Sequence, residues 1–523
     1  MAQTRSRTAY QNRHASVPTP NYQRSLFKRK FGNKFTMNEG DLHVIHCDEI
    51  YAGDTLNANM QSFIRLTTPI TPIMDGIEFD LHAFFVPSRL VMTDYYKMMG
   101  EQINPGDSTD ILIPQITATT FTENSVADQF GLPTKVAIPQ ADMPIALPFR
   151  GLNLIWNDWF RDQNLQDSLE VKTDNTDDDI SLYTIQKRNK KHDYFTSCLP
   201  NAQKGDSVNI SLGSSAPIVS NALFDDSNSS GNHLTIQDTS GAKHLLIGSN
   251  PWVDGSSVNH SSYPDTYADL ANAEGISVND LRDALSIQHI LERRMRSGTR
   301  DVEILSSTYG ISPSDTRLQR PELLGSSRAN LTLNTVAQTS STDTVSPLGE
   351  LSAVGTINAN MNFTYSAVEN GFLIVLASAR AEVSYQQGMA KMWSKRSYLD
   401  VLDPLRANIG EQPVLRKEIY MDTVEDDNNA VFGYLPNFDD LRFGRNIITG
   451  NFRSNHTESL DIWHFAQDFA NAPVLGEEFI KQDAPVDRVL AVADAPDFFG
   501  DMYMKVNHFR VLPTYGVPGL KRI

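Results

Sequence analysis

The sequence predicts a mainly β protein built as an antiparallel β-sandwich, and three observations support this class. Several segments alternate apolar and polar side chains with the period of two that is typical of a half-buried strand. Regular helices do not separate these segments, which argues against a parallel βαβ sheet. The segments also lie far apart in the chain, as the strands of two packed antiparallel sheets do. At 523 residues the chain is too long for one ordinary core, so we expect long insertions or further domains.

The chain begins with a basic segment, which we assign as an N-terminal arm over residues 1–40. Its first 34 residues contain eight Arg and Lys and no acid, although the whole chain has a formal charge of −18. Such cations neutralise phosphates without reading sequence, and the interleaved aromatic residues suit stacking on unpaired bases. We predict that the arm binds DNA; a solvated terminus and docking onto a neighbouring subunit are the alternatives. The candidate DNA-binding residues are Arg5, Arg7, Arg13, Arg24, Lys28, Arg29, Lys30 and Lys34.

Strands are predicted where the alternation is clearest. In residues 55–66, Leu56, Met60 and Ile64 share one face, and Gln61 lies on the other. Other segments repeat this pattern, and one begins as the continuous apolar run expected of a central strand. The further predicted strands cover residues 77–83, 357–365, 371–385 and 498–512.

Helices are predicted inside the connections. Residues 150–163 and 279–297 carry apolar side chains at helical spacing, and a shorter helix is expected over Val91–Met99. The second helix has capping residues at its start and Gly298 as its stop. We expect both long helices to spread over neighbouring subunits. The candidate subunit-interface residues are Trp156, Trp159, Phe160, Arg293 and Arg294.

A polar stretch over residues 201–275 changes the character of the chain. It is rich in Ser, Asn, Asp and Gly, and it is longer than the loops that compact domains usually tolerate. We therefore predict a surface insertion here. It separates residues 41–200, with the first strands and a helical insertion, from residues 276–523, with helices, the remaining strands and a C-terminal extension.

No motif in the sequence indicates catalysis, a cofactor or a metal. Phosphate-binding glycine loops, zinc-protease motifs and nucleophile elbows are absent. The acidic run at residues 173–179 has oxygen ligands but lacks the pattern of a calcium loop, and His43, His46 and Cys47 are more simply explained as packed side chains. Two cysteines make no disulfide framework, and the sequence lacks a secretory signal or an apolar run long enough to span a membrane. We therefore expect a protein made in the cytoplasm.

Four blocks of the sequence carry a resemblance to a known family. The blocks are DEIYAGDTLNANMQSFIRLTTPITPIMDGIEFDLHAFFVPSRLV (48–91), LPFRGLNLIWNDWFRDQNLQDS (147–168), SGTRDVEILSSTYGISPSDTRLQRPELLG (297–325) and VAQTSS (336–341). They resemble the major capsid proteins of the gokushovirus branch of the Microviridae. The similarity runs through most of residues 20–200 and 279–523, and blocks of this length are specific.

The resemblance implies an eight-stranded viral jelly roll with long insertions, assembled as an icosahedral shell of about sixty copies. It also implies a virion built in the cytoplasm of a bacterial host, with a single-stranded DNA genome inside and small DNA-binding and minor pilot proteins as partners. In this family a long insertion forms the protrusion thought to contact the host receptor. Applied to residues 201–275, this implies the candidate host-contact residues Asp225, Asn228, His233, Trp252, Asp254 and Tyr263.

The sequence also allows a second hypothesis for the function. A β-sandwich that binds a host surface or a carbohydrate, with residues 201–275 as its recognition loop and no shell, would have the same composition. An enzyme built on such a scaffold is the third reading. It would need a pocket with convergent titratable groups, of which the sequence gives no sign.

Overall fold

The computed structural model describes residues 24–208, 278–339, 348–492 and 494–515, together with the backbone of four short strands between residues 218 and 268. The chain divides into two compact units. The first comprises Met1–Ala202 and Arg294–Ile523, and the second is Gln203–Arg293.

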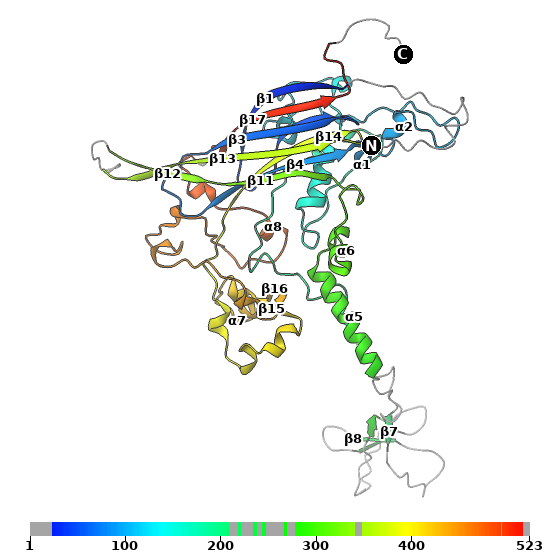
Figure 1. Cartoon of the computed structure of the whole chain (residues 1–523). Coiled ribbons are helices and arrows are strands. Elements are labelled where there is room, and N and C mark those ends of the chain that lie inside the picture. Colours follow the sequence, from blue (N-terminus) through cyan, green and yellow to red (C-terminus); the bar gives the residue numbers. More distant parts are fainter. Residues whose placement is uncertain are drawn as a thin grey trace. The chain divides into compact units, whose positions relative to one another are not determined.

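Two antiparallel sheets form the body of the first unit (Figure 1). The five-stranded sheet has the order β1 (Ser25–Met37), β17 (Phe498–Arg510), β3 (Thr55–Leu66), β13 (Leu351–Ser366) and β12 (Thr332–Ala337). The four-stranded sheet has the order β11 (Glu322–Asn330), β4 (Ile77–Pro87), β14 (Gly371–Ala381) and β2 (His43–Ile50). The prediction of a mainly β, antiparallel protein is confirmed.

The inner faces of the two sheets enclose the main hydrophobic core. Met60 and Ile64 of β3 pack in one cluster with Phe79 of β4, Ile357 of β13 and Val375 of β14. Every second residue of β3 from Leu56 to Leu66 is buried, as the alternation predicted. The predicted strand bounds 55–66 coincide with β3, because a sheet with one buried face imposes that period on the sequence.

The four-stranded sheet is covered on its other face as well. All eleven residues of β14 are buried, which agrees with the continuous apolar run in the sequence. A second core joins this face to helix α4 (Leu147–Ile155) and the π-helical turn η4 (Trp156–Phe160), with the short helices α1 (Ser88–Val91), α2 (Tyr95–Met98) and α3 (Val126–Gln129) around it. Nearby, β5 (Ile116–Thr117) and β6 (Asp178–Asp179) form a minimal parallel pair.

A third apolar cluster supports a lobe attached to the sandwich. It contains Phe195, Val414, Phe432 and Phe479. The lobe includes the hairpin-like pair β15 (Glu411–Leu415) and β16 (Val431–Pro436), with α7 (Glu425–Asn429) and α8 (Glu477–Ile480).

The predicted long helices are present with shifted ends. Residues 147–160 are helical where 150–163 were predicted, and α5 covers Val278–Arg296 where 279–297 were predicted. The single helix predicted over Val91–Met99 is instead split into α1 and α2. Helix α6 (Asp301–Tyr309) was not predicted. In the described part of the chain, no helix combines the length and apolar character needed to cross a bilayer.

The predicted N-terminal arm divides in this structure. Residues 25–37 form β1, paired along its whole length with β17, so this half is an edge strand of the sandwich and not a free tail.

In the second unit, β7 (Ile218–Ser220) pairs with β10 (Thr266–Ala268), and β8 (Leu234–Gln237) pairs with β9 (Lys243–Leu246).

Candidate nucleic-acid interface

The outer face of the five-stranded sheet is open to solvent, and we call the outward side chains of β1, β17, β3 and β13 the open face. Along each strand these positions alternate with core residues. Its side chains are chiefly amides, cations and aromatic rings. The main ones are Lys28, Lys30, Lys34, Asn57, Asn59, Gln61, Phe63, Arg65, Asn358, Asn360, Asn362, Phe499, Tyr503 and Lys505.

The strand register arranges these side chains in rows across the sheet. One row contains Lys30, Lys505, Asn59 and Asn362, each directly opposite the next on the neighbouring strand. Asn59 donates a side-chain hydrogen bond to Asn362 within this row. In the next row, Tyr503 lies opposite Gln61, and Gln61 lies opposite Asn360. Both rows therefore have a cation or an aromatic ring on β17 and amides on β3 and β13.

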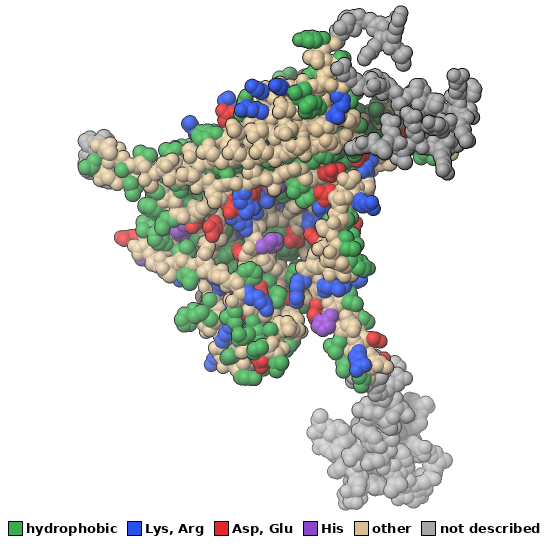
Figure 2. All heavy atoms as spheres, viewed as in Figure 1, with side chains coloured by type: hydrophobic (Ala, Val, Ile, Leu, Met, Phe, Trp, Pro, Cys, Tyr) green, Lys and Arg blue, Asp and Glu red, His purple; other side chains and the backbone are tan. Residues whose placement is uncertain are grey.

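The open face is cationic although the chain as a whole is acidic. It carries Lys28, Lys30, Lys34, Arg65 and Lys505 against a single acid, Asp501. The carboxylate of Asp501 lies 3.9 Å from the Lys34 ammonium, and both side chains are well exposed. Figure 2 shows Lys and Arg side chains gathered at the edge of the molecule where β1 and β17 lie.

Aromatic rings are placed beside the cations. The Arg65 guanidinium lies 5.3 Å from the centre of the Phe63 ring, and the Lys505 ammonium lies 5.5 Å from that of Tyr503. Both rings are partly exposed, as is Phe499 in the next row. Cations that neutralise phosphates, rings that stack on bases and amides that hydrogen-bond without a fixed code are the elements of a sequence-tolerant single-strand interface.

The structure separates the predicted DNA-binding residues into groups. Lys28, Lys30 and Lys34 lie on the open face. Arg29 points the other way and forms a half-buried ion pair with Asp48 at 2.5 Å, so its charge is already compensated. Arg24 is exposed and donates to Thr55 Oγ1 at 2.8 Å. The remaining candidates, Arg5, Arg7 and Arg13, lie outside the described residues.

Sequence reasoning missed part of this surface. The alternation in residues 55–66 places Phe63 and Arg65 on the same side as Gln61, but nothing in the sequence connected them to Lys28 and Lys30. Tyr503 and Lys505 were not singled out at all. The alternation of each strand places these residues outward, whereas their proximity depends on pairing between β1, β17 and β3, which are far apart in the sequence.

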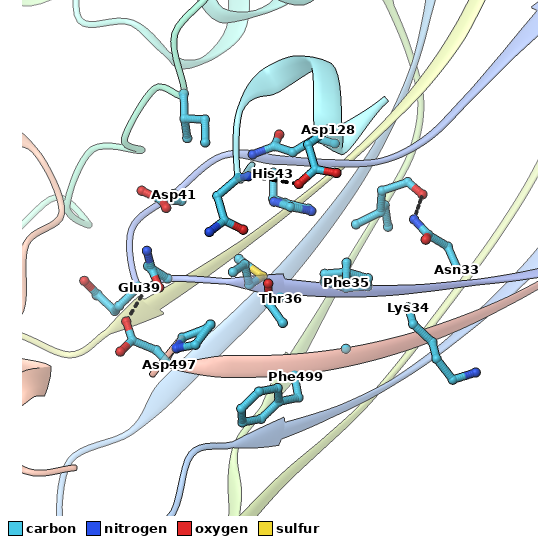
Figure 3. Close-up of a pocket in the computed structure, with 18 of the residues that line it drawn as sticks. Asn33, Lys34, Phe35, Thr36, Glu39, Asp41, His43, Asp128, Asp497 and Phe499 are labelled. Carbon is cyan, nitrogen blue, oxygen red and sulfur yellow. Dashed lines mark hydrogen bonds between the residues drawn. The ribbon is translucent and has the colours of Figure 1, made fainter. Parts of the chain in front are cut away.

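A cleft of about 1160 Å³ lies beside β1, and its charge is opposite to that of the open face (Figure 3). The backbone N–H of Glu39 donates to Asp497 at 2.7 Å, and Ala381 N–H donates to the Glu39 carboxylate at 2.9 Å. Burial raises the pKa of Glu39 to about 7 and that of Asp41 to about 6. Because acids outnumber cations in the lining, this cleft repels phosphates. Its ionisable lining comprises Glu39, Asp41, Asp128, Asp483, Asp487, Asp494, Asp497 and Asp501 against Lys34, Arg65 and Lys187, with His43 and His46.

The candidate subunit-interface residues differ in their accessibility. Trp156 is only 3% exposed and packs in the second core, so the structure corrects this assignment: the ring stabilises its own chain and is closed to a neighbour. Trp159 donates to the Pro321 carbonyl at 3.0 Å and lies under the Arg320 guanidinium. Phe160 packs against His82 and Phe84. Arg293 and Arg294 are exposed on α5.

The side chains that the sequence offered as possible metal ligands make other interactions in the structure. Asp178, from the acidic run, is fully buried and accepts from the Arg150 guanidinium at 2.7 Å. His43 stacks on Phe35, and burial lowers its pKa to about 4. Across the described residues, no three His, Cys, Asp or Glu side chains converge as a metal site.

The predicted host-contact residues all lie outside the described part of the chain. They are Asp225, Asn228, His233, Trp252, Asp254 and Tyr263.

Comparisons with known proteins give one consistent result. Residues 15–520 match the family described as capsid protein (F protein). The chain is 41% identical over 529 residues to capsid protein VP1 of Bdellovibrio phage phiMH2K, with 97% of each chain covered. It is 38% identical over 587 residues to capsid protein VP1 of Chlamydia phage 1, with 98% of each covered. For capsid protein VP1 of Spiroplasma virus 4 the identity is 36% over 523 residues, with 93% of each covered.

Proposed function

The chain belongs to the capsid protein (F protein) family, and from that premise we propose how its two sheets serve a viral coat. It is a structural protein of the virion and not an enzyme, and a capsid protein assembles with copies of itself around the phage genome. Because the chain belongs to this family, we discard the alternative hypothesis of a carbohydrate- or host-binding sandwich that forms no shell.

We infer that the sandwich is an eight-stranded viral jelly roll with β12 as an added strand. The orders β1-β17-β3-β13 and β2-β14-β4-β11 support this, because each sheet interleaves strands from the two ends of the chain as a pair of Greek keys does. The proposed assembly is a closed icosahedral shell of about sixty copies, one for each rotation of that symmetry. Such a shell would form in the bacterial cytoplasm.

The open face is the surface that we propose to contact the genome, a circular single-stranded DNA in the gokushovirus-like virus that the sequence resembles. One observation carries this proposal: Lys30 and Lys505 lie opposite each other on neighbouring strands, and the exposed ring of Tyr503 lies in the next row. The acidic chain needs such a surface, because its net charge of −18 repels DNA elsewhere. Arg5, Arg7 and Arg13 extend the same proposal, and small internal DNA-binding and minor pilot proteins remain proposed partners.

The test is a double variant, Lys30→Gln with Lys505→Gln, against the matched control Lys135→Gln with Lys481→Gln, whose lysines lie outside the open face. Single-strand binding releases about 0.7 counterions per neutralised phosphate, so the first pair should lower the salt slope of binding by about 1 to 1.5 and reduce the DNA content of particles. Equal slopes and equal DNA content in both variants would refute the assignment.

We also propose that residues 201–275 form an exposed element that attaches the particle to a bacterial receptor. The separation of Gln203–Arg293 as its own compact unit supports this. Replacement of residues 210–270 by a short Gly/Ser linker should leave assembly intact and abolish adsorption to cells. Normal adsorption by such particles would contradict the proposal.

A further inference from the structure

One exposed surface of the lobe is strongly apolar, and the open face does not explain it. Eight large apolar side chains within residues 391–409 are at least half exposed, among them Trp393 at 71%, Tyr398 at 77% and Leu405 at 86%. We call this set the apolar surface. Its members are Met392, Trp393, Tyr398, Leu399, Val401, Leu402, Leu405 and Ile409.

Local hydrogen bonds fix the backbone that presents these side chains. The stretch consists of three short 3₁₀ turns, η6 (Lys391–Ser394), η7 (Tyr398–Asp400) and η8 (Pro404–Asn408). The Asp400 carboxylate accepts from Ser397 N–H at 2.7 Å, and Asp403 accepts from Leu405 N–H at 2.9 Å. The polar side chains therefore satisfy the turns, while the apolar ones point away from the chain that carries them.

The lobe anchors this stretch at both ends. The Lys395 ammonium forms a 2.8 Å ion pair with the largely buried Asp440, and the Asn437 side chain donates to the Arg406 carbonyl at 2.8 Å. Asn437 and Asp440 follow β16, which pairs with β15, and both strands contribute side chains to the third apolar cluster. Figure 2 shows hydrophobic side chains gathered over the part of the molecule where Figure 1 places β15, β16 and α7.

The area of the apolar surface exceeds what a monomer normally exposes. Two large aromatic rings alone offer on the order of 300 Å², whereas the largest apolar patch of a typical monomer covers about 300–600 Å² in total. With six further aliphatic side chains, the surface approaches the ~800 Å² that each partner contributes to a stable interface. Within the described residues, no other segment of the chain covers it.

The charges around the apolar surface favour an acidic partner. Residues 391–409 contain four cations against two acids, and both acids, Asp400 and Asp403, cap the turns, whereas Arg396 is exposed. A surface that is apolar and carries a net positive charge complements a chain of net charge −18. The partner that a capsid protein meets at high local concentration, and that carries this charge, is another copy of itself.

We propose that the apolar surface over residues 391–409 is a subunit interface, buried in the shell against a second copy of this chain. The inference rests on the proposed function, because it requires that the chain forms a closed shell. It goes further by naming the segment that drives association. Burial of these side chains supplies the hydrophobic part of the contact, and Arg396 adds a charge that favours the acidic neighbour.

The first test compares Leu405→Asp with Leu112→Asp. Leu112 is 84% exposed on a loop whose Ile111 and Ile113 pack against the second core, so the two variants place the same charge at equally exposed leucines. Sedimentation and electron microscopy should find assembled particles reduced at least tenfold for Leu405→Asp and near the wild-type yield for Leu112→Asp. Unchanged circular dichroism and thermal melting of the unassembled subunits would establish that both variants fold.

The second test needs no loss of assembly. In Leu405→Cys particles, a membrane-impermeant maleimide should label position 405 at least tenfold more slowly than in dissociated subunits, with wild-type particles as the background for Cys47 and Cys198. Wild-type yields of Leu405→Asp particles, or fast labelling of Cys-substituted particles, would overturn the inference while leaving the proposed function intact. Failure of the wild-type chain to form particles would instead refute the proposed function.

Discussion

The two sheets of the sandwich share one core but differ in what lies on their outer faces. The four-stranded sheet is covered, so Asp80, His82 and Phe84 of β4 face other parts of the same chain. The five-stranded sheet is uncovered, and the corresponding positions of β3 and β13 are amides, rings and cations in solvent. One sheet is therefore an internal layer, and the other presents a surface.

The covered face shows how the fold holds polar groups where water is excluded. Asp80 is 2% exposed and accepts hydrogen bonds from Arg188 at 2.6 Å, Arg328 at 2.7 Å and Arg380 at 2.8 Å. Burial alone would raise the pKa of Asp80, but the three guanidinium groups outweigh burial and hold it below its ordinary value. Charges on the covered face are thus committed to the fold, whereas those on the open face remain available to a ligand.

The largest expected difference between the faces comes from removing one charge on each. Asp80→Asn leaves three guanidinium groups around a neutral side chain, and breaking such a buried network should cost about 3–5 kcal/mol of unfolding free energy. The matched variant on the open face, Asp501→Asn, loses only an exposed pair and should cost less than about 1 kcal/mol. Urea unfolding of the purified subunits measures both. Equal losses would mean that the open face is as structurally committed as the covered one.

A pH titration gives a smaller and more selective difference. Burial, helped by the charge of Arg188, lowers the pKa of His82 to about 4. As pH falls below the ordinary histidine value of 6.5, the unfolded chain binds this proton first, so stability is lost between about pH 6.5 and pH 4.

His82→Phe removes that loss and keeps an aromatic ring between Phe84 and Phe160. The stability of the variant relative to wild type should therefore rise by on the order of 2 kcal/mol between pH 7 and pH 4. Thermal melts across this range measure the change. The exposed His456, changed to Phe, is the matched control for replacing a histidine by an aromatic ring at the surface. If the stability of His82→Phe relative to wild type does not change with pH, the His82 ring is in contact with water.

The contrast between the sheets also explains what the sequence could predict. Strict alternation identified β3 and β13, and the continuous apolar run identified β14, because each pattern records which faces of the strand are buried. Strand β1 was missed because its inward residues include polar ones. Arg29 pairs with Asp48, and Asn33 donates to the Ile45 carbonyl at 2.8 Å, so their partners exist only after β1 lies against β2.

The open face was only partly predictable for a related reason. Lys28 and Lys30 stood out as part of a basic run, but Lys505 lies opposite Lys30 only in the folded register. For Trp156 the sequence predicted too much exposure. Its helical spacing correctly placed it on an apolar stripe, but that stripe packs in the second core of the same chain and not against a neighbouring subunit. Periodicity distinguishes buried from exposed positions along one strand, but it carries no information on which distant strand supplies the neighbour.

The smallest expected effect concerns the amides of the open face, and it tests whether they serve the sheet or a ligand. Asn59 and Asn362 lie directly opposite each other on β3 and β13 and share a hydrogen bond. Exposed cross-strand pairs of this kind contribute roughly 0.2–1 kcal/mol. In a double-mutant cycle with Asn59→Ala and Asn362→Ala, the coupling free energy should fall in that range while affinity for single-stranded DNA falls measurably. A coupling well above this range, with unchanged DNA affinity, would show that the amide row holds the two strands together and that the open face is structural like the covered one.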